Sequence, residues 1–365
     1  MSTSRRHARG LASVVVVLAM VAALSACTPR AEPGDHVANP GEAGPSALVS
    51  VSCSDLAALD DIRGVLGEAV EPDDFPGEPG GTWALTRIGL QQGGALFCHW
   101  SDAARQSGTY PAELEIIALP DASAWTTWES ELSAWAPPTA LGDSSHGTCA
   151  SSLGGSYRYC THNVLVDGIW LYIAVNNLTD PATADPLVRT VVDAISAAEV
   201  KPASWSAPAT GITLPEDCEA LLATDLVAAT VATADIAPRE PSLAMPLLHN
   251  VGLHSGPSNG LDCSWSNPYT SAVPMPVSVS VLPGAGWAWE SEWARPRPER
   301  NPATAHPGLG DAAFSGCAAD ESNTCFVDVL ADGAWIAVSG NKQAGVDSLA
   351  ALAGAALESL GYTTK

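Results

Sequence analysis

The sequence predicts an α+β fold in two tandem homologous copies, each an antiparallel sheet with helices on one face and two disulfides. First, the spacing of eight cysteines repeats, with an offset of 165 residues for three of them and 168 for the fourth. Second, four short motifs recur in the same order, and third, both copies show the same succession of helical and strand patterns. The matched cysteines are Cys53, Cys98, Cys149 and Cys160 in the first copy and Cys218, Cys263, Cys317 and Cys325 in the second.

The recurring motifs fix the register of the duplication between the cysteines. Each motif occurs once in each copy, in the same order along the chain. The pairs are Cys98-His99-Trp100-Ser101 with Cys263-Ser264-Trp265-Ser266, Trp128-Glu129-Ser130-Glu131 with Trp289-Glu290-Ser291-Glu292, Leu141-Gly142-Asp143 with Leu309-Gly310-Asp311, and Asp167-Gly168-x-Trp170 with Asp332-Gly333-x-Trp335.

A helix is expected to open each copy, because apolar residues recur near the helical period after a capping residue. In the first copy Ser54-Asp55 is the expected N-cap, and the apolar residues are Leu56, Leu59, Ile62 and Leu66. The second copy has Glu219, Leu221, Leu222 and Leu226 in their place.

Strands and two further helices are expected to follow in the first copy. Strand patterns cover 95–101, 112–119, 157–166 and 168–176, and a tight turn at Asp167-Gly168 joins the last two. One helix follows Pro120 and carries Trp125, Trp128, Leu132 and Trp135 on one face. A closing helix turns Leu187, Val191, Val192 and Ile195 inward.

The chain has nine cysteines, and eight remain when Cys27, the expected lipid attachment site, is set aside. An even number in an exported chain is typical of a disulfide framework. Four cysteines allow three pairings in each copy. We favour closure within each copy, because duplicated domains that fold alone should form their own bridges. The expected pairs are Cys53–Cys98, Cys149–Cys160, Cys218–Cys263 and Cys317–Cys325.

The N-terminus indicates export and lipid attachment. Residues 1–26 have three arginines, an apolar run too short for a bilayer span, and a small-residue end, which is the pattern of a signal peptide. Leu24-Ser25-Ala26-Cys27 resembles the bacterial lipobox, so Cys27 is the expected lipid attachment site. The expected location is the outer face of the cytoplasmic membrane.

Composition sets the remaining boundaries. Residues 27–50 are rich in Pro, Gly, Ala and Glu and are expected to form a disordered tether. The first copy is expected over 51–200, a linker over 201–213, and the second copy over 214–362.

The charge balance excludes nucleic acid as an expected partner. The chain has 40 acidic and 16 basic residues, a formal charge of −24, and removal of residues 1–26 takes away three arginines and no acid. Such a chain should be soluble and should repel nucleic acid.

The search for chemistry yields no expected catalytic residue, metal site or cofactor. Ser144, Ser145 and His146 lie in a segment, 142–147, that is interpreted as a polar turn, since the second copy has neither serine nor histidine there. His249 and His254 lie in a Gly- and Pro-rich stretch without counterparts in the first copy. Glu71, Asp73 and Asp74 form an acidic cluster without EF-hand spacing and are interpreted as a solvated loop.

The tryptophans offer candidates for an exposed contact. Most of them lie on helical stripes or beside cysteines, where core packing is expected. Trp205 in the linker and Trp287, off the face that Trp289 and Trp293 define, are the two candidates. The glutamates shared by the Trp-Glu-Ser-Glu motifs (Glu129, Glu131, Glu290 and Glu292) are interpreted as a hydrated helix face.

A resemblance to known proteins rests on the opening cysteine, the Cys-x-Trp strand and the Gly-Asp motif before the closing cysteines. These features resemble a group of actinobacterial lipoproteins of unknown function. They are more distantly similar to the extracellular sensor domain of mycobacterial receptor serine/threonine kinases. The resemblance implies a ligand-sensing or interaction role without naming a ligand.

The sequence therefore predicts a non-enzymatic binding or interaction protein of the cell envelope. Its expected partners are the membrane, through the lipid on Cys27, and an envelope protein or small ligand. Two alternatives stay open. One is a carrier of hydrophobic cargo between membrane and wall, which requires an apolar cavity. The other is an envelope hydrolase, which requires acids or histidines that converge with perturbed pKa values.

Overall fold

In the computed structural model, the chain is described over twelve stretches. These are residues 44–73, 81–102, 111–134, 136–151, 158–178, 180–233, 235–239, 247–254, 259–266, 277–294, 303–317 and 324–363. The predicted signal peptide (residues 1–26) and Cys27 lie outside them, as does Trp135.

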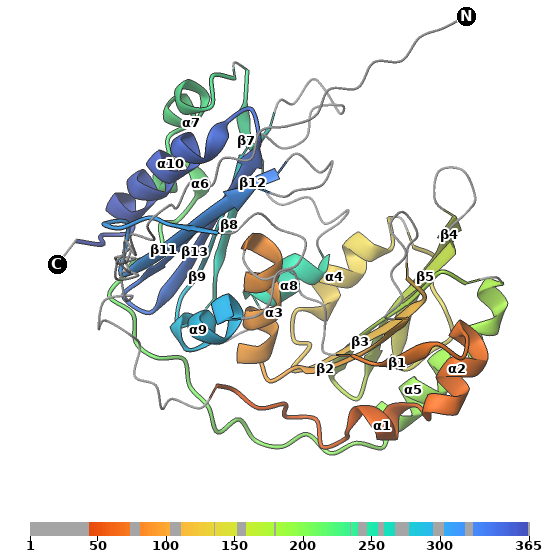
Figure 1. Ribbon diagram of the computed structural model, residues 1–365. Helices are drawn as coiled ribbons and strands as arrows, with labels where there is room; N and C mark the ends of the chain where they lie inside the picture. Colours follow the sequence, from red (N-terminus) through yellow and green to blue (C-terminus); the bar gives the residue numbers. More distant parts are fainter. Residues whose placement is uncertain are drawn as a thin grey trace, which may run out of the picture. The chain divides into compact units, whose positions relative to one another are not determined.

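Two antiparallel sheets form the framework (Figure 1), and they share the same order of six strands, to which the second sheet adds β10 at one edge. The first has the order β1-β2-β3-β6-β5-β4 and the second β10-β11-β12-β13-β9-β8-β7. The first sheet comprises β1 (Val70–Pro72), β2 (Leu96–Asp102), β3 (Glu113–Pro120), β4 (Ser144–Ser151), β5 (Arg158–Val166) and β6 (Ile169–Asn176). The second comprises β7 (Ala237–Arg239), β8 (Leu261–Ser266), β9 (Val277–Leu282), β10 (Thr304–Ala305), β11 (Ala312–Cys317), β12 (Thr324–Ala331) and β13 (Ala334–Asn341). The tandem α+β prediction is confirmed.

The opening and closing helices cover one face of each sheet, called here the first face. On the first sheet these are α1 (Cys53–Leu56), α2 (Leu59–Leu66) and α5 (Asp185–Ser196), which follows the short helix η1 (Pro181–Thr183). On the second sheet they are α6 (Cys218–Leu221), α7 (Thr224–Thr230) and α10 (Gly345–Ser359). The inward residues predicted for the closing helix of the first copy are all buried.

The opening helix differs from its prediction, because it is broken into two pieces. The N-cap is Ser52 rather than Ser54, and both its amide and its hydroxyl donate to Asp55, at 3.2 and 2.5 Å. Ala57 is extended, which ends α1 before α2 begins. In the second copy the same break turns Leu226 outward, with 43% of its surface exposed, and Val227 takes the buried position.

The second face of each sheet is also covered by helices, which the one-face prediction did not include. They are α4 (Trp125–Leu132) on the first sheet, α9 (Gly286–Ala294) on the second, and two helices that the sequence pattern did not predict, α3 (Gly81–Gln92) and α8 (Leu247–His254). Trp125 and Trp128 are buried as predicted, but they pack on the second face with Trp170.

The helices α3 and α8 join the two copies reciprocally. Ile88 of the first copy packs in the apolar cluster of the second sheet, while Val251 of the second copy packs in the cluster of the first. Two residues further on, Leu90 and Leu253 each pack on their own copy's sheet. The sequences around them, Ile-Gly-Leu and Val-Gly-Leu, are themselves a repeat. The two copies are therefore interlocked through equivalent helices.

Glycines allow these helices to approach closely. A Cβ atom placed on Gly89 would overlap the carbonyl oxygen of Gly252, and one placed on Gly252 would overlap that of Thr86. Any larger side chain at the crossing would force the two backbones apart.

A buried ion pair crosses the same junction and corrects the prediction of a hydrated glutamate face. Arg87 of α3 pairs with Glu292 of α9, and their side chains are only 5% and 2% exposed. Glu290 lies two residues before Glu292 in the same motif, and its side chain is exposed as predicted. The same motif therefore provides one surface carboxylate and one buried anchor for the other copy.

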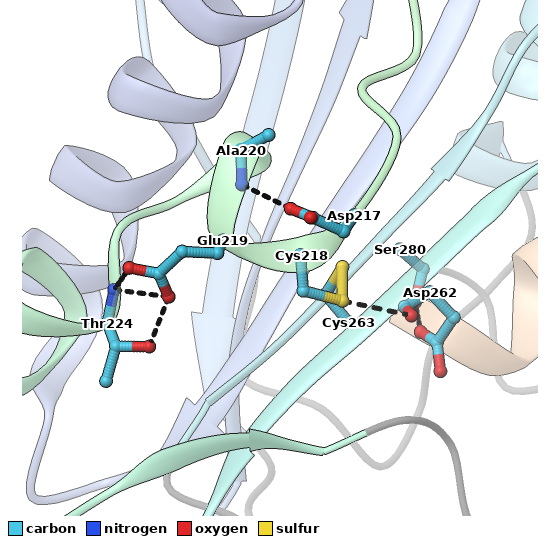
Figure 2. Close-up of a disulfide and its surroundings, with 8 residues drawn as sticks. All are labelled: Asp217, Cys218, Glu219, Ala220, Thr224, Asp262, Cys263 and Ser280. Atoms are coloured by element: carbon cyan, nitrogen blue, oxygen red, sulfur yellow. Dashed lines mark hydrogen bonds between the residues drawn. A yellow bond between two sulfur atoms is a disulfide. The ribbon is translucent and has the colours of Figure 1, made fainter.

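The four disulfides have the predicted connectivity. In each copy the longer bridge ties the opening helix to an inner strand, and the shorter one joins two strands at directly paired positions, Cys149 with Cys160 and Cys317 with Cys325. Figure 2 shows the longer bridge of the second copy, between Cys218 of α6 and Cys263 of β8.

The surroundings of that bridge show how short helices are held without a long apolar stripe (Figure 2). The Asp217 side chain accepts from the amide of Ala220 at 2.8 Å and caps α6. Glu219 accepts from the amide of Thr224 at 3.1 Å and from its hydroxyl at 2.6 Å, at the start of α7. The side chains predicted as part of an apolar stripe therefore include a capping carboxylate.

Candidate functional site

The Leu-Gly-Asp motif has a structural role in both copies. Asp143 accepts from the amide of Asp167 at 2.9 Å, and Asp311 accepts from the amide of Asp332 at 2.7 Å. Asp167 and Asp332 begin the two-residue turns of the Asp-Gly-x-Trp motif, with φ of 49° and 46°. One motif thus holds the hairpin turn formed by the other.

The tryptophans of the repeated motifs are also structural. Trp170 donates to Asn163 at 3.2 Å, and Trp335 donates to Asp328 at 3.0 Å, all four being buried. The tryptophans of the two Cys-x-Trp motifs lie in the cores of the first faces. The motifs shared by both copies therefore have structural roles. A functional site is better sought among residues that differ between the copies.

A polar cluster on the second face of the first sheet is such a difference. His99 of β2 and Glu115 of β3 are directly paired across the two strands, and Glu113 lies two residues before Glu115 on the same face. The His99 side chain is 2% exposed, with Nε2 3.7 Å from Glu113 and Nδ1 4.0 Å from Asp73. Ser101 donates to the same Asp73 oxygen at 3.0 Å. We call these five residues the first-copy cluster.

Burial and neighbouring charge set the electrostatics of this cluster. Burial raises the pKa of Glu115 to about 8, and the neighbouring charge of Glu113 adds to the effect. Glu113 in turn accepts a hydrogen bond from the amide group of Asn176. At neutral pH one carboxyl of the cluster therefore holds its proton beside an imidazole and two further carboxylates.

The second copy has hydroxyl groups in place of this acid–base chemistry. Ser264 replaces His99 in the repeated motif, and its strand partner Ser278 takes the position of Glu115. Ser278 shares a hydrogen bond of 2.7 Å with Ser339. The two copies thus keep the same sheet and differ in charge at the same place.

A buried polar row lies elsewhere on the second face of the second sheet. Ser280 donates to Asp262 at 2.6 Å, and both are buried. Their counterparts by strand register in the first copy are Ile117 and Phe97. The second copy is therefore polar at both pairs of positions, whereas the first copy is polar only at the pair formed by His99 and Glu115.

The interpretation of residues 142–147 as a polar turn is wrong for the second half of the segment, because β4 begins at Ser144. Ser144 donates to Glu129, and the ring Nδ1 of His146 lies 2.9 Å from the carbonyl oxygen of Ala136. Ser145 shares a hydrogen bond of 2.7 Å with Thr139. These side chains hold the edge of the sheet and do not form a Ser-His-Asp arrangement.

The two tryptophans proposed as exposed contacts are both half-buried and contact each other. Trp205 and Trp287 have ring centroids 6.4 Å apart in an edge-to-face arrangement. The backbone of Gly44 lies against the six-membered ring of Trp287, since a Cβ placed there would be 2.5 Å from Cε3. A small pocket beside Trp205 is lined mainly by Pro45, Ser46, Leu48, Gln92, Ala203 and Ser204.

The sequence candidates for metal binding are spread over different elements. His254 is exposed at the end of α8, and the side chain of His249 lies outside the described residues, as does Asp74. Glu71 pairs with Arg63, whereas Asp73 belongs to the first-copy cluster. The described part of the chain contains no group of three or more His, Cys, Asp or Glu side chains that could hold a metal ion.

Sequence reasoning missed the first-copy cluster, although one signal pointed to it. Glu113 and Glu115 alternate with apolar residues, a pattern typical of a solvent-facing strand side. The signal is the comparison of copies, because His99 becomes Ser264 in the repeated motif. The match of Glu115 with Ser278 follows only from the strand register.

The described helices do not include one with both the length and the hydropathy that a membrane span requires. No family model, no curated protein and no solved structure matches this chain.

Proposed function

We propose that this chain is a lipid-anchored, extracytoplasmic binding protein of the cell envelope, without enzymatic activity, that engages its ligand through the first-copy cluster. The observation that carries the proposal is the asymmetry between the copies. Both keep the cysteines, the Leu-Gly-Asp turn and the buried tryptophans. Among the described strand residues, only the first copy has a histidine and two glutamates on the second face of its sheet.

The charge of the cluster indicates the class of ligand. Three of its five residues, Asp73, Glu113 and Glu115, carry carboxyl groups. A cationic group, such as an amine, placed near them would stabilise the ionised carboxylates and release the proton of Glu115. We therefore propose a ligand or partner segment with a positive charge, whose binding is coupled to proton release. The resemblance to envelope lipoproteins and sensor domains is consistent with this role.

The test exchanges the cluster for the residues of the second copy. The double variant His99→Ser/Glu115→Ser reproduces Ser264 and Ser278, which the same sheet accommodates. Wild-type and variant chains are captured from native envelope after gentle solubilisation, and bound species are identified by mass spectrometry. The proposal predicts a ligand or partner that copurifies with the wild type and not with the variant. Equal recovery from both, or from neither, would contradict it.

A hydrolase is the second candidate, favoured by one observation. The raised pKa of Glu115 beside Glu113 and His99 supplies a protonated acid next to a potential base at neutral pH. Turnover of chromogenic ester or glycoside probes that is lost in Glu115→Gln, but retained in the surface variant Glu290→Gln, would favour catalysis over binding.

The carrier hypothesis has weaker support. It requires an apolar cavity on the order of several hundred Å³ within one copy. In both copies, apolar side chains of the two sheet faces are packed against helices. Recovery of a lipid from both the wild type and the double variant would instead favour this alternative.

A further inference from the structure

The residues that precede the first copy meet the junction between the copies. Val49 pairs with Val200 as an antiparallel bridge and is 3% exposed within the first core. On either side, the amide of Ser50 donates to the carbonyl of Glu199 and the amide of Lys201 donates to that of Leu48, both at 2.8 Å. The end of the predicted tether is thus a bonded part of the structure.

The same segment is tied to the interlocking helix α3. The amide of Leu48 donates to the carbonyl of Gly94, just after α3, at 2.9 Å. A Cβ placed on Gly94 would overlap the Leu48 side chain, so the two are in close contact. At the end of α3, Gln92 donates to the carbonyl of Pro283 in the second copy at 3.2 Å.

The segment also reaches the second copy directly. Gly44 lies against the ring of Trp287 at the start of α9, and Trp205 of the linker packs edge-on against that indole. Residues 44–50 therefore contact the first copy, the linker and the second copy within seven residues.

We propose that residues 44–50 form a strap that couples the N-terminal tether to the junction of the two copies. A load applied through the preceding residues reaches the contact between Gly44 and Trp287 first and the bonds of Leu48 and Ser50 after it. Release of the strap removes the contacts that hold the start of the linker and the first turn of α9. This coupling is independent of the ligand site and of the lipid on Cys27.

Two glycines allow the strap to be displaced from opposite sides, each with a matched control. Gly94→Ala forces Leu48 away, and Gly168→Ala is its control, because both glycines have a φ of 77° and nothing lies within 4 Å of a Cβ at Gly168. Gly44→Ala forces the strap off Trp287, and Gly64→Ala is its control, since a Cβ there also meets nothing within 4 Å.

Hydrogen exchange of the full mature chain provides the measurement, because local opening is read at single amides. We expect the amides of Leu48, Ser50 and Lys201 to exchange about tenfold faster in Gly94→Ala and Gly44→Ala than in their controls. If the strap couples the two copies, Gly94→Ala in the first copy should also speed exchange at the amide of Ala288, in the first turn of α9 of the second copy. Amides of β5 and β6 should be unaffected.

Two results would overturn the proposal. Exchange at Leu48, Ser50 and Lys201 that matches the controls would show that the contacts do not hold the segment. Loss of protection throughout β5 and β6 in both Gly94→Ala and Gly44→Ala would show that residues 44–50 are an inseparable part of the first core rather than a strap.

Discussion

At the residue scale, the ion pair between Arg87 and Glu292 shows how a shared motif position acquires a different role in one copy. Both side chains are almost fully buried, so each charge depends on the other. Removal of one partner from a buried pair leaves an uncompensated charge, whereas joint replacement by apolar residues is often neutral or stabilising.

The first prediction follows from this dependence. Glu292→Leu should lower the free energy of unfolding by about 3–5 kcal/mol. The double variant Arg87→Met/Glu292→Leu should recover most of that loss. Denaturant unfolding of both variants, with the exposed Glu290→Gln as control, provides the test. An equal loss in single and double variants would contradict the role of the pair.

Glu115 makes stability depend on pH. Its pKa is raised from 4.5 to about 8 in the folded protein by burial first and by Glu113 second. Between these two values the folded state retains a proton that the unfolded state has lost, so stability falls as pH rises through that window.

The second prediction is therefore a pH-dependent gain for Glu115→Gln. Relative to the wild type, the variant should gain little near pH 4 and an amount on the order of 1–3 kcal/mol near pH 8, since one pKa unit corresponds to about 1.4 kcal/mol and partial exposure reduces the effect. Unfolding curves at pH 4, 6 and 8 measure the gain. A difference that does not grow with pH, as expected for Glu290→Gln, would show that Glu115 is not perturbed.

At the element scale, the crossing of α3 and α8 is the feature on which the joined copies depend. Gly89→Ala places a methyl group against the backbone of Gly252, and overpacking of this kind costs about 1–3 kcal/mol. We expect a lower Tm for this variant. Gly64→Ala in α2 is the control, because its Cβ meets nothing and alanine favours the helix. Equal Tm changes in the two variants would contradict the close crossing.

Helices and strands that bury a single face were predictable from the sequence. Elements whose apolar residues face two sheets, or that have few apolar residues, were not. The alternation in β3 and the apolar stripe of α5 identify them, because each has one buried side. By contrast, α3 places Leu85 and Ile88 on the second sheet and Leu90 on the first, so its apolar residues form no single stripe. The strand β4 consists of small and polar residues, and its place is fixed by pairing with β5.

At the scale of the whole molecule, duplication explains both the success and the limit of sequence reasoning. The disulfide connectivity followed from matched cysteine spacing, because each copy closes its own bridges. The interlocking of the copies did not, because it depends on helices whose partners lie in the other copy. The first-copy cluster was also missed, since Glu113 and Glu115 in an alternating strand have the pattern of a solvated side.

The central claim is that the first-copy cluster binds a ligand and that the equivalent surface of the second copy does not. Native mass spectrometry of residues 28–365, secreted as a soluble chain, tests it most directly, with His99→Ser/Glu115→Ser measured alongside. The account predicts a reproducible added mass on the wild-type chain, beyond the oxidised polypeptide with four disulfides, that is absent from the variant. A wild-type chain that carries no added mass, or an added mass that the variant retains, would contradict it.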